Sequence, residues 1–400
     1  MRVIVIGSGI GGLCCAIGLR KIGLDVALYE RAPELREVGA GIMIWANGLR
    51  AIEALGVGES VRAVTMPAVR LMLAGQNGRQ EQMVAESAAF EKELGYTPFV
   101  GFIHRAELVR SLAAHLPPGF ARYGHDCVSV EQSGERVTVR FANGQTDVAD
   151  LLIGADGIRS AVRTALFGPP QLRYAGYTCW RGICPRPAAV RTGDLYLWTG
   201  RGSQVGINTL TKDRVYWFAT RNAPAGMVAV DERVAALDVF RDWAAPLPEL
   251  IASTPAERVI RADITDRQPS RPWSRGRVLL VGDAAHPTTP NFGQGGGMAI
   301  EDAVVLARCL ATVPNAEDAL AKFEAERFRR TSAVTNEAWE FGKMLQWEGR
   351  VSVWLRDLLA GMLIKMNGTN NLIKHARHNV GTVPTLGRSA EPGAVADGGA

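Results

Sequence analysis

Short, continuous runs of hydrophobic residues recur along the chain, and each of them predicts a buried β-strand. Val3–Ile6, Asp25–Tyr29, Asp150–Ile153 and Val278–Val281 are apolar at nearly every position. Runs of this length and composition are typical of parallel strands that are covered on both faces. Segments with helical spacing separate the runs, so we predict an α/β fold that is built on a parallel sheet.

Residues 170–270 have a different pattern, in which polar and apolar side chains alternate and aromatic residues are frequent. Alternation with a period of two predicts strands that have one covered face. We therefore expect an antiparallel sheet that forms a second domain, and its aromatic residues can fill a core or wall an apolar pocket. The expected strands are Tyr174–Ile183, Leu195–Trp198, Gln204–Leu210, Arg214–Thr220 and one near Arg258–Asp266.

Two long segments with helical spacing follow, Ala316–Trp347 and Val351–Met366. The second has an apolar side, and we expect this side to pack over the domain. Binding to a membrane is the alternative, but the polar side lacks the basic residues typical of lipid-bound helices. Residues after Gly381 are rich in Gly, Ala and Pro and predict a disordered tail. The apolar side consists of Trp354, Leu355, Leu358, Leu359, Met362 and Leu363.

Composition and charge narrow the possible functions. The 400 residues are 47% hydrophobic and 21% charged, as in an ordinary globular protein. The net charge of +5 comes from scattered arginines without a basic cluster, which disfavours nucleic acid and favours an anionic cofactor or substrate. No apolar run approaches the ~20 residues of a membrane span. Because a core strand is predicted where a signal peptide would lie, we expect a cytoplasmic protein.

The six cysteines form no dense framework, so we expect buried thiols in a reducing compartment. Cys179 and Cys184 have a C-x4-C spacing that some redox-active pairs use. The alternative, which we favour, is that both are ordinary strand residues, because a redox pair needs an exposed and activated thiolate.

The first apolar run opens a dinucleotide-binding motif. Gly7, Gly9 and Gly12 give G-x-G-x-x-G before a predicted helix at Leu13–Ile22, and Glu30 follows the next strand. In this context the glycines allow a tight turn, close approach of a pyrophosphate and close helix packing, while the acid accepts from a ribose hydroxyl. The motif alone fits NAD or FAD. The glycine-bounded loop Gly39–Gly41 and the helix from about Asn47 that follow, in place of a direct return to a third strand, favour FAD.

A second glycine-rich stretch follows the last apolar run. Gly282–Asp283 breaks the strand, Pro287 and Pro290 stiffen the loop, and Gly293–Gly297 leads into a predicted helix at Met298–Leu310. Glycines at a helix N-terminus offer free N–H groups and the positive end of a dipole, which suit an anion. The carboxylate at the end of the strand suits a hydroxyl group. We predict that the reactive ring of a cofactor lies here.

Two other segments carry candidate site residues. Asp156–Gly157 forms a predicted turn after a strand, and Ser160 and Arg163 begin a helix, which repeats the strand–turn–helix order of a nucleotide fold. Arg105 precedes another predicted helix, where the dipole disfavours a cation. We therefore predict that Arg105 contacts a diphosphate, with an exposed surface charge as the alternative.

Taken together, three separated motifs resemble those of the single-component FAD-dependent monooxygenases, the para-hydroxybenzoate-hydroxylase-like aromatic hydroxylases. Gly7–Gly12 resembles the family's ADP site, Asp156–Gly157 with Arg163 its DG motif, and Gly282–Asp283 with His286–Pro287 its GD motif. The resemblance runs from residue 1 to about residue 375. It implies a Rossmann-type FAD-binding domain interleaved with an antiparallel-sheet substrate domain, and C-terminal helices. The implied divisions are 1–70, 101–168 and 276–312 for FAD, 71–100 and 169–275 for substrate, 313–380 for the helices, and 381–400 for a disordered tail.

The resemblance also implies a role for each site residue. At the cofactor these are Gly9, Ile10, Gly11 and Gly12 at the ADP moiety, Glu30 and Arg31 at the adenosine, Gly41 and Met43 near the flavin, Arg105 at the diphosphate, Val128 on the adenine side, Asp156 in the DG motif, Asp283 on the ribityl chain, and Gly295, Gly296, Gly297 and Met298 at the flavin's pyrimidine edge. At the substrate they are Gln204, Asn208, Tyr216 and Pro290. His286 and Tyr216 are candidates for orienting or deprotonating the substrate, although His286 can equally order its loop. No metal site is expected.

The implied reaction is hydroxylation of an aromatic small molecule, phenolic or heteroaromatic. FAD is the implied cofactor, NADH or NADPH the transient reductant, O2 the co-substrate, and a C4a-hydroperoxide of the flavin the oxygen donor. Within the family, the chain resembles members that act on small substrates, such as salicylate, urate or hydroxybenzoate hydroxylases. Urate-type members pair an arginine with their acidic substrate from the strand that here carries Gln204. A neutral polar contact is therefore expected, while Arg181 or Arg201 can still supply a charge.

Two alternatives stay open at this point. The flavin can instead support epoxidation of an alkene, whereas halogenation is disfavoured because the W-x-W-x-I-P motif of related halogenases is absent. The chain can also be a non-enzymatic partner protein that binds FAD or NAD. We expect a monomer or a homodimer without stable membrane association.

Overall fold

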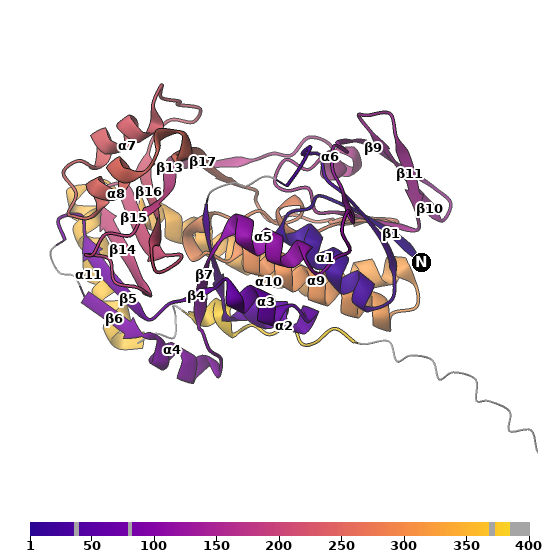
Figure 1. Ribbon diagram of the computed structural model, residues 1–400, viewed down its shortest axis with the longest axis horizontal. Helices are drawn as coiled ribbons and strands as arrows, with labels where there is room; N and C mark the ends of the chain where they lie inside the picture. The colour runs from indigo at the N-terminus through magenta and orange to yellow at the C-terminus, as the bar shows by residue number, and fades with distance from the viewer. Residues whose placement is uncertain (36–39, 79–81, 368–372, 385–400) are drawn as a thin grey trace, which may run out of the picture.

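The structure, a computed structural model, describes residues 1–35, 40–78, 82–367 and 373–384. Figure 1 shows a parallel sheet with its helices on the right and a large antiparallel sheet on the left. The long helices α9 (Gly295–Thr312) and α10 (Ala316–Leu345) cross the middle of the molecule. The predicted fold, a Rossmann-type part interleaved with an antiparallel sheet, is confirmed.

The parallel sheet contains the four apolar runs. Its order is β18-β19-β12-β1-β2-β8, and neighbouring strands are parallel except for β18, which turns back on β19. Helices cover the sheet, and the apolar residues of its central strands are buried, as continuous hydrophobic runs require. The strands are β1 (Arg2–Ile6), β2 (Asp25–Tyr29), β8 (Ala121–Arg122), β12 (Leu151–Gly154), β18 (Ser274–Arg275) and β19 (Val278–Leu280).

Small residues bring the helix of the first motif, α1 (Ile10–Lys21), against α9. A Cβ added at Gly18 would lie 3.2 Å from the Ala303 carbonyl oxygen, and one added at Gly11 would lie 3.4 Å from Ala299 Cβ. The two glycine-rich stretches are therefore held side by side. Other helices of this part are α2 (Ala46–Leu55), α3 (Gly58–Ala63), α5 (Arg105–Ala113) and α6 (Ala161–Phe167).

Two smaller sheets accompany the parallel sheet. One has the order β3-β7-β4, and the other is the antiparallel sheet β11-β10-β9. The loop predicted at Gly39–Gly41 is partly wrong, because Gly41 begins strand β3, while Gly39 lies outside the described residues. The strands are β3 (Gly41–Trp45), β4 (Met66–Pro67), β7 (Val100–His104), β9 (Cys127–Ser133), β10 (Arg136–Phe141) and β11 (Thr146–Ala149).

The large antiparallel sheet has the order β17-β13-β16-β15-β14-β5-β6, with β14 and β5 as its parallel pair. One face packs on the helices α7 (Glu232–Phe240) and α8 (Leu247–Ser253) through Trp217 and Trp198. The other face, which we call the inner face, carries Arg181, Leu197, Gln204, Asn208, Tyr216 and Phe218. The strands are β5 (Arg70–Gly75), β6 (Gln82–Glu86), β13 (Arg173–Pro185), β14 (Asp194–Gly200), β15 (Ser203–Thr209), β16 (Arg214–Asn222) and β17 (Ile260–Asp266). Helix α4 (Ser87–Leu94) follows β6.

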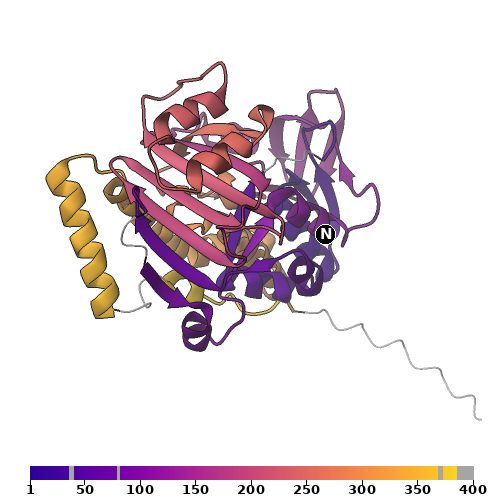
Figure 2. The same cartoon turned by 60° about the vertical axis from the view of Figure 1, so that its left-hand side comes forward.

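The last long helix, α11 (Arg350–Asn367), corrects one prediction. Figure 2 shows it standing at the edge of the molecule. Trp354 is 64% exposed, and Leu355, Leu358 and Leu359 are at least 39% exposed, so this side does not pack over the domain. The residue spacing predicted an apolar side on this helix, but spacing does not specify whether another part of the protein packs on that side. The side chains of Met362 and Leu363, like the predicted tail beyond residue 384, lie outside the described part of the chain.

Other sequence predictions can be compared directly. All six cysteines lie in described residues, where they are buried and form no disulfide. Cys179 and Cys184 are both residues of β13, and burial raises the pKa of the Cys184 thiol, which is unlike a redox pair. Over the described segments, none of the helices combines the length and the apolar composition that a membrane span requires.

Candidate functional site

The glycines after β1 form a cradle at the N-terminus of α1. A Cβ added at Gly7 would lie 2.5 Å from the Ala155 carbonyl oxygen, and one at Gly12 would lie 1.8 Å from the Gly7 carbonyl oxygen. Packing therefore requires both glycines. A Cβ at Gly9, by contrast, meets nothing within 4 Å, so Gly9 borders open space. The N–H groups of the first helical turn have no partner within the helix and can bind an anion there.

Glu30 lies beside this cradle at the end of β2. Its Oε2 accepts hydrogen bonds from the Ser8 N–H at 2.8 Å and the Ser8 hydroxyl at 3.1 Å. The exposed Arg31 follows Glu30 in the chain. The N–H of His125 donates to the Glu30 carbonyl oxygen at 2.8 Å, and Val128 follows three residues after His125. Val128 is 60% exposed. The structure thus gathers the residues predicted for the adenosine end of a cofactor at one end of the sheet.

Asp283 lies in the loop after β19, next to Gly282, which faces Ala299 of α9 as Gly11 of the cradle does. It is exposed to solvent and has no hydrogen-bond partner among the described residues. Burial raises the pKa of its carboxyl, while the neighbouring His286, Arg105 and Arg267 lower it. This interaction also locates Arg105, which begins α5 and is exposed, near Asp283. A carboxylate with free acceptor sites can hold a hydroxyl group.

The first turn of α9 contains Gly295, Gly296 and Gly297, so the helix begins three residues before the predicted Met298. A Cβ at Gly296 would lie 2.8 Å from Ile42 Cδ1, and one at Gly48 would lie 3.0 Å from Gly297 Cα. Close packing on β3 and α2 therefore favours helical glycines here. Met298 is fully buried, so only its backbone can face a ligand.

A buried group of charges lies behind this turn and orders the Asp283 loop. His286 Nε2 is 2.7 Å from Asp302 Oδ2, which also accepts the Gly282 N–H at 2.8 Å. Arg327 of α10 donates through Nε to Asp302 Oδ1 at 2.7 Å and pairs with Glu301 Oε2 at 2.7 Å. The His286 side chain is 4% exposed. This position fits the alternative role of His286, in which it orders its own loop.

Asp302, Glu301 and Arg327 were not predicted as members of this group. A signal was present: two adjacent acids in an otherwise apolar helix require a buried cation. Asn47 was also missed; its amide donates to Glu301 Oε1 at 2.6 Å and to Gln294 Oε1 at 2.9 Å. The two amides fix the start of α2 against the start of α9.

Stability should fall as acid protonates this group. Burial would raise the pKa of Asp302, but His286 and Arg327 hold it well below its usual value, and Arg327 and Arg330 lower the pKa of Glu301. A carboxyl whose pKa is lowered on folding stabilises the fold above its unfolded pKa of about 4, and this stabilisation is lost as the pH falls further. We expect the free energy of unfolding, measured by urea denaturation between pH 7 and pH 3, to change less with pH in Asp302→Asn than in the wild type. The exposed Asp238→Asn is the control, and equal pH slopes for all three would contradict the expectation.

The DG motif has a structural role through its side chain. Asp156 Oδ1 accepts from the Ser160 hydroxyl at 2.5 Å, and Oδ2 accepts from the Ala161 N–H at 2.7 Å, so the carboxylate caps α6. Only the backbone of Asp156 is free for a cofactor. Arg163 is buried behind it, near Arg267, whose Nη1 donates to the Ala284 carbonyl oxygen at 3.2 Å.

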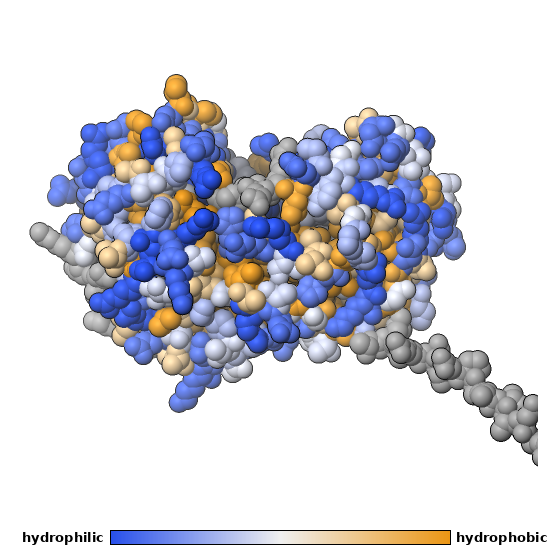
Figure 3. Space-filling model, viewed as in Figure 1, coloured by the Kyte–Doolittle hydropathy of each residue, from blue (hydrophilic) through white to orange (hydrophobic). Residues whose placement is uncertain are grey.

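The inner face of the large sheet lies against this part of the molecule. A Cβ at Gly41 would lie 2.5 Å from Tyr216 Cγ, and one at Gly293 would lie 2.3 Å from Met43 Cε. The predicted flavin-side and substrate-side residues therefore meet. Gln204 and Asn208 are buried beside Tyr216, yet their side-chain amides bond to none of the described residues. Figure 3 shows the surface hollowed between the two lobes.

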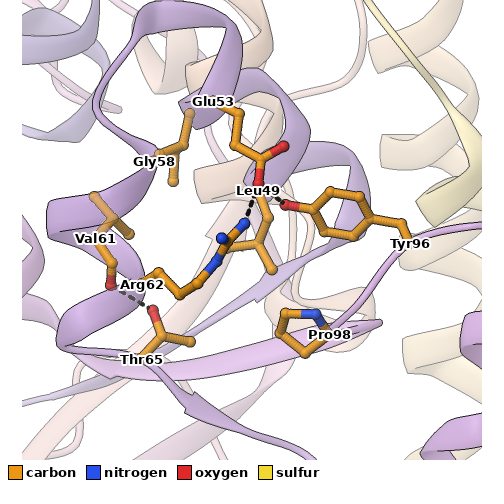
Figure 4. Close-up of a pocket in the computed structure, with 9 residues that line it drawn as sticks. Leu49, Glu53, Gly58, Val61, Arg62, Thr65, Tyr96 and Pro98 are labelled. Carbon is orange, nitrogen blue, oxygen red and sulfur yellow. Dashed lines mark hydrogen bonds and ion pairs between the residues drawn. The ribbon is translucent and has the colours of Figure 1, made fainter.

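Pro290 is exposed and begins the short 3-10 turn Pro290–Phe292. The next residue, Asn291, accepts from the Tyr177 hydroxyl at 3.2 Å, which connects this loop to β13. A separate pocket lies between α2, α3 and Tyr96 (Figure 4), where Tyr96 donates to Glu53 at 2.8 Å. Its cavity of 10 Å³ is the size of one water molecule and holds neither a cofactor nor a substrate. Among the described residues no group of three or more His, Cys, Asp or Glu could hold a metal ion.

These features fit FAD: a glycine cradle with open space at Gly9, an acid at the end of β2, a free carboxylate at Asp283 and a glycine helix start. The sequence profile of a family described as FAD binding domain matches residues 1–338. Aurachin C monooxygenase/isomerase of Stigmatella aurantiaca is 37% identical over 96% of this chain and 99% of its own. FAD-dependent urate hydroxylase of Klebsiella pneumoniae is 36% identical over 82% of this chain and 86% of its own.

Solved structures agree with the sequence comparisons. The crystal structure of Klebsiella pneumoniae HpxO complexed with FAD and uric acid superposes with a TM-score of 0.86 and 31% identity, covering 94% of this chain and 96% of that chain. The resemblance drawn from three motifs is thereby confirmed. The chain belongs to the FAD-binding-domain family and is an FAD-dependent monooxygenase.

Proposed function

We propose that this enzyme is an NAD(P)H-dependent hydroxylase of a small, uncharged aromatic compound, phenolic or heteroaromatic. One observation carries the proposal: among the described residues the side-chain amides of buried Gln204 and Asn208 have no partner, and they lie on the sheet face that meets Gly41. Amides without a protein partner are free to hydrogen-bond a polar group of a ligand. Bound FAD supplies the redox chemistry, accepting a hydride from NAD(P)H and activating O2.

The chain's own residues bind and orient FAD in this proposal. The cradle amides of Ile10, Gly11 and Gly12 hold the diphosphate with Arg105, and Glu30 holds the adenosine ribose beside Arg31 and Val128. Asp283 holds the ribityl chain. The N-terminus of α9 faces the pyrimidine edge of the ring, where its dipole stabilises negative charge. The divisions given from the sequence are proposed as the domain boundaries.

The substrate lies between the ring and the inner face. Tyr216 is a hydrogen-bond donor rather than a base. Burial raises the pKa of its phenol and outweighs the opposing effect of Arg181, so the phenol is protonated at neutral pH. His286 is a positioning residue, since its Nε2 is bound to Asp302. Gln204 in place of a cation favours a neutral ring, and the apolar neighbours Leu197 and Phe218 keep water from it.

The purified protein should be yellow, and an aromatic substrate should stimulate its oxidation of NADH or NADPH. A screen of phenols, aromatic acids and fused heteroaromatic compounds, with peroxide measured in parallel, separates hydroxylation from uncoupled oxidation. Labelled O2 should place one oxygen atom on the product ring. If the product is an epoxide, the enzyme is an epoxidase and not a hydroxylase. Flavin-loaded protein whose NAD(P)H oxidation no compound stimulates would overturn the proposal.

A further inference from the structure

Arg181 is the basic residue of the inner face that the proposed function leaves without a role. On β13 it pairs in register with Phe218 of β16, and Phe218 pairs with Gly206 of β15. Residues that pair across strands lie on the same face of a sheet. Gln204 and Asn208 flank Gly206 on that face, two residues to either side. Arg181, Tyr216 and the two amides therefore surround one ring, that of Phe218. This ring lies over Gly206, because a Cβ added at Gly206 would be 2.0 Å from Phe218 Cε1.

Among the described residues, Arg181 differs from the other partly buried arginines of this sheet in having no counter-ion, a lack that it shares only with the exposed Arg214 and Arg221. Arg70 binds Asp194 through two bonds of 2.8 and 2.9 Å, Arg173 binds Asp266 through two bonds of 2.9 Å, and Arg261 pairs with Asp263 at 2.9 Å. Arg181 is also partly buried, yet among the described residues no carboxylate pairs with it.

The groups that interact with the Arg181 guanidinium are a thiol and two phenols, those of Cys179, Tyr216 and Tyr177. Cys179 and Tyr216 interact with it and raise its pKa, against an opposing effect of burial. Tyr177 and Tyr216 remain protonated at neutral pH because burial raises the pKa of each phenol. A partly buried cation without a partner is costly, and a ligand that supplies negative charge removes the cost.

We infer that Arg181 recognises an oxygen atom of the aromatic substrate, a ring hydroxyl bound as its phenolate or a carbonyl oxygen. This inference rests on the proposed function and adds the charge that Gln204 lacks. A nearby positive charge lowers the pKa of a bound phenol. The hydroxyl proton passes to solvent through the cleft, and the resulting phenolate makes the ring more electron-rich for attack by an oxygen donor. Arg201 does not compete for this role, because it is exposed and its Nε donates to the Glu348 carbonyl oxygen at 2.8 Å.

The test uses the FAD-loaded enzyme and 4-nitrophenol, whose phenolate has its own visible absorbance. Titration of the bound probe with pH should show a phenol pKa below that of free 4-nitrophenol in the wild type. Arg181→Gln should raise this pKa by about one unit or more, since an adjacent opposite charge shifts a pKa by 1–3 units. Arg181→Lys should restore part of the shift. Arg221→Gln removes an exposed cation from the outer face of β16 and should match the wild type.

Two results would overturn the inference. One is an unchanged probe pKa in Arg181→Gln that retains bound FAD and a wild-type thermal unfolding curve. The other is wild-type, FAD-loaded enzyme that does not bind the probe. Neither probe binding nor its pH titration requires turnover, so these results do not decide the proposed function. That function has its own test, and it is overturned only if no aromatic compound stimulates NAD(P)H oxidation.

Discussion

Replacing Arg327 with methionine should lower the free energy of unfolding by about 3–5 kcal/mol, the usual result of removing one partner from a buried ion pair. Arg327 is 1% exposed, and its partners Asp302 and Glu301 are fully buried. Methionine fills much of the space but removes the cation that the two carboxylates share, so that, among the described residues, Glu301 keeps an ion pair only with Arg330, at 3.6 Å, and Asp302 keeps one only with His286. Because Asp302 also binds the Gly282 N–H and His286, the Asp283 loop should loosen and the FAD content of the purified variant should fall.

Urea denaturation at pH 7 measures this effect, with Arg241→Gln as the matched control. Arg241 pairs with Asp238, but both side chains are more than 60% exposed. An exposed pair of this kind contributes about 0.2–1 kcal/mol. If the two variants lose equal stability, the buried group does not hold the fold as described. An Arg327→Met, Asp302→Asn double variant should lose less than the two single losses added together, because the residues interact directly.

Alanine at Gly9 and alanine at Gly12 should both reduce FAD binding, but for different reasons. At Gly12 the new methyl group would lie 1.8 Å from the Gly7 carbonyl oxygen, so α1 must move away from β1. Overpacking of this kind costs about 1–3 kcal/mol, and the apoprotein should melt at a lower temperature. At Gly9 the methyl group meets no protein atom within 4 Å. The apoprotein should then melt like the wild type, while the methyl group occupies the space that a pyrophosphate needs.

Thermal unfolding of the apoproteins and titration with FAD separate these two effects. Gly9→Ala should weaken FAD binding by about tenfold or more, equivalent to at least 1.4 kcal/mol, without a change in melting temperature. Wild-type affinity in Gly9→Ala would show that the cofactor does not approach the chain at this glycine. A wild-type melting temperature in Gly12→Ala would show that α1 can shift at no cost.

The sequence predicted the elements whose signals are local. Apolar runs located the central parallel strands, alternation located the antiparallel strands, and the first glycine motif located the cradle. Strand β3 was missed at its start because a single strand of five residues acquires its partner, β7, only more than fifty residues later. The start of α9 was placed too late because glycine disfavours helix. Packing of Gly297 on Gly48 outweighs that preference.

The candidate site was predictable only in part, for a similar reason. Glycines and Asp283 stand in motifs that a single segment reveals. The pairing of Asp302 with Arg327 joins two helices, and the meeting of Gly41 with Tyr216 joins two sheets. Neither is visible until the chain is folded. The apolar side of α11 was visible in its spacing, but the spacing does not specify a neighbour.

The strand order of the parallel sheet has a consequence for synthesis on the ribosome. β12 is the fourth strand of this sheet in chain order, and its outer neighbour, β19, lies about 120 residues further along the chain. At about 5–20 residues per second, this interval lasts roughly 6–25 s. During it, the apolar edge of Leu151–Ile153 has no strand beside it and can pair with another nascent chain. The yield of folded enzyme should therefore depend on chaperones and on the rate of translation between these two strands.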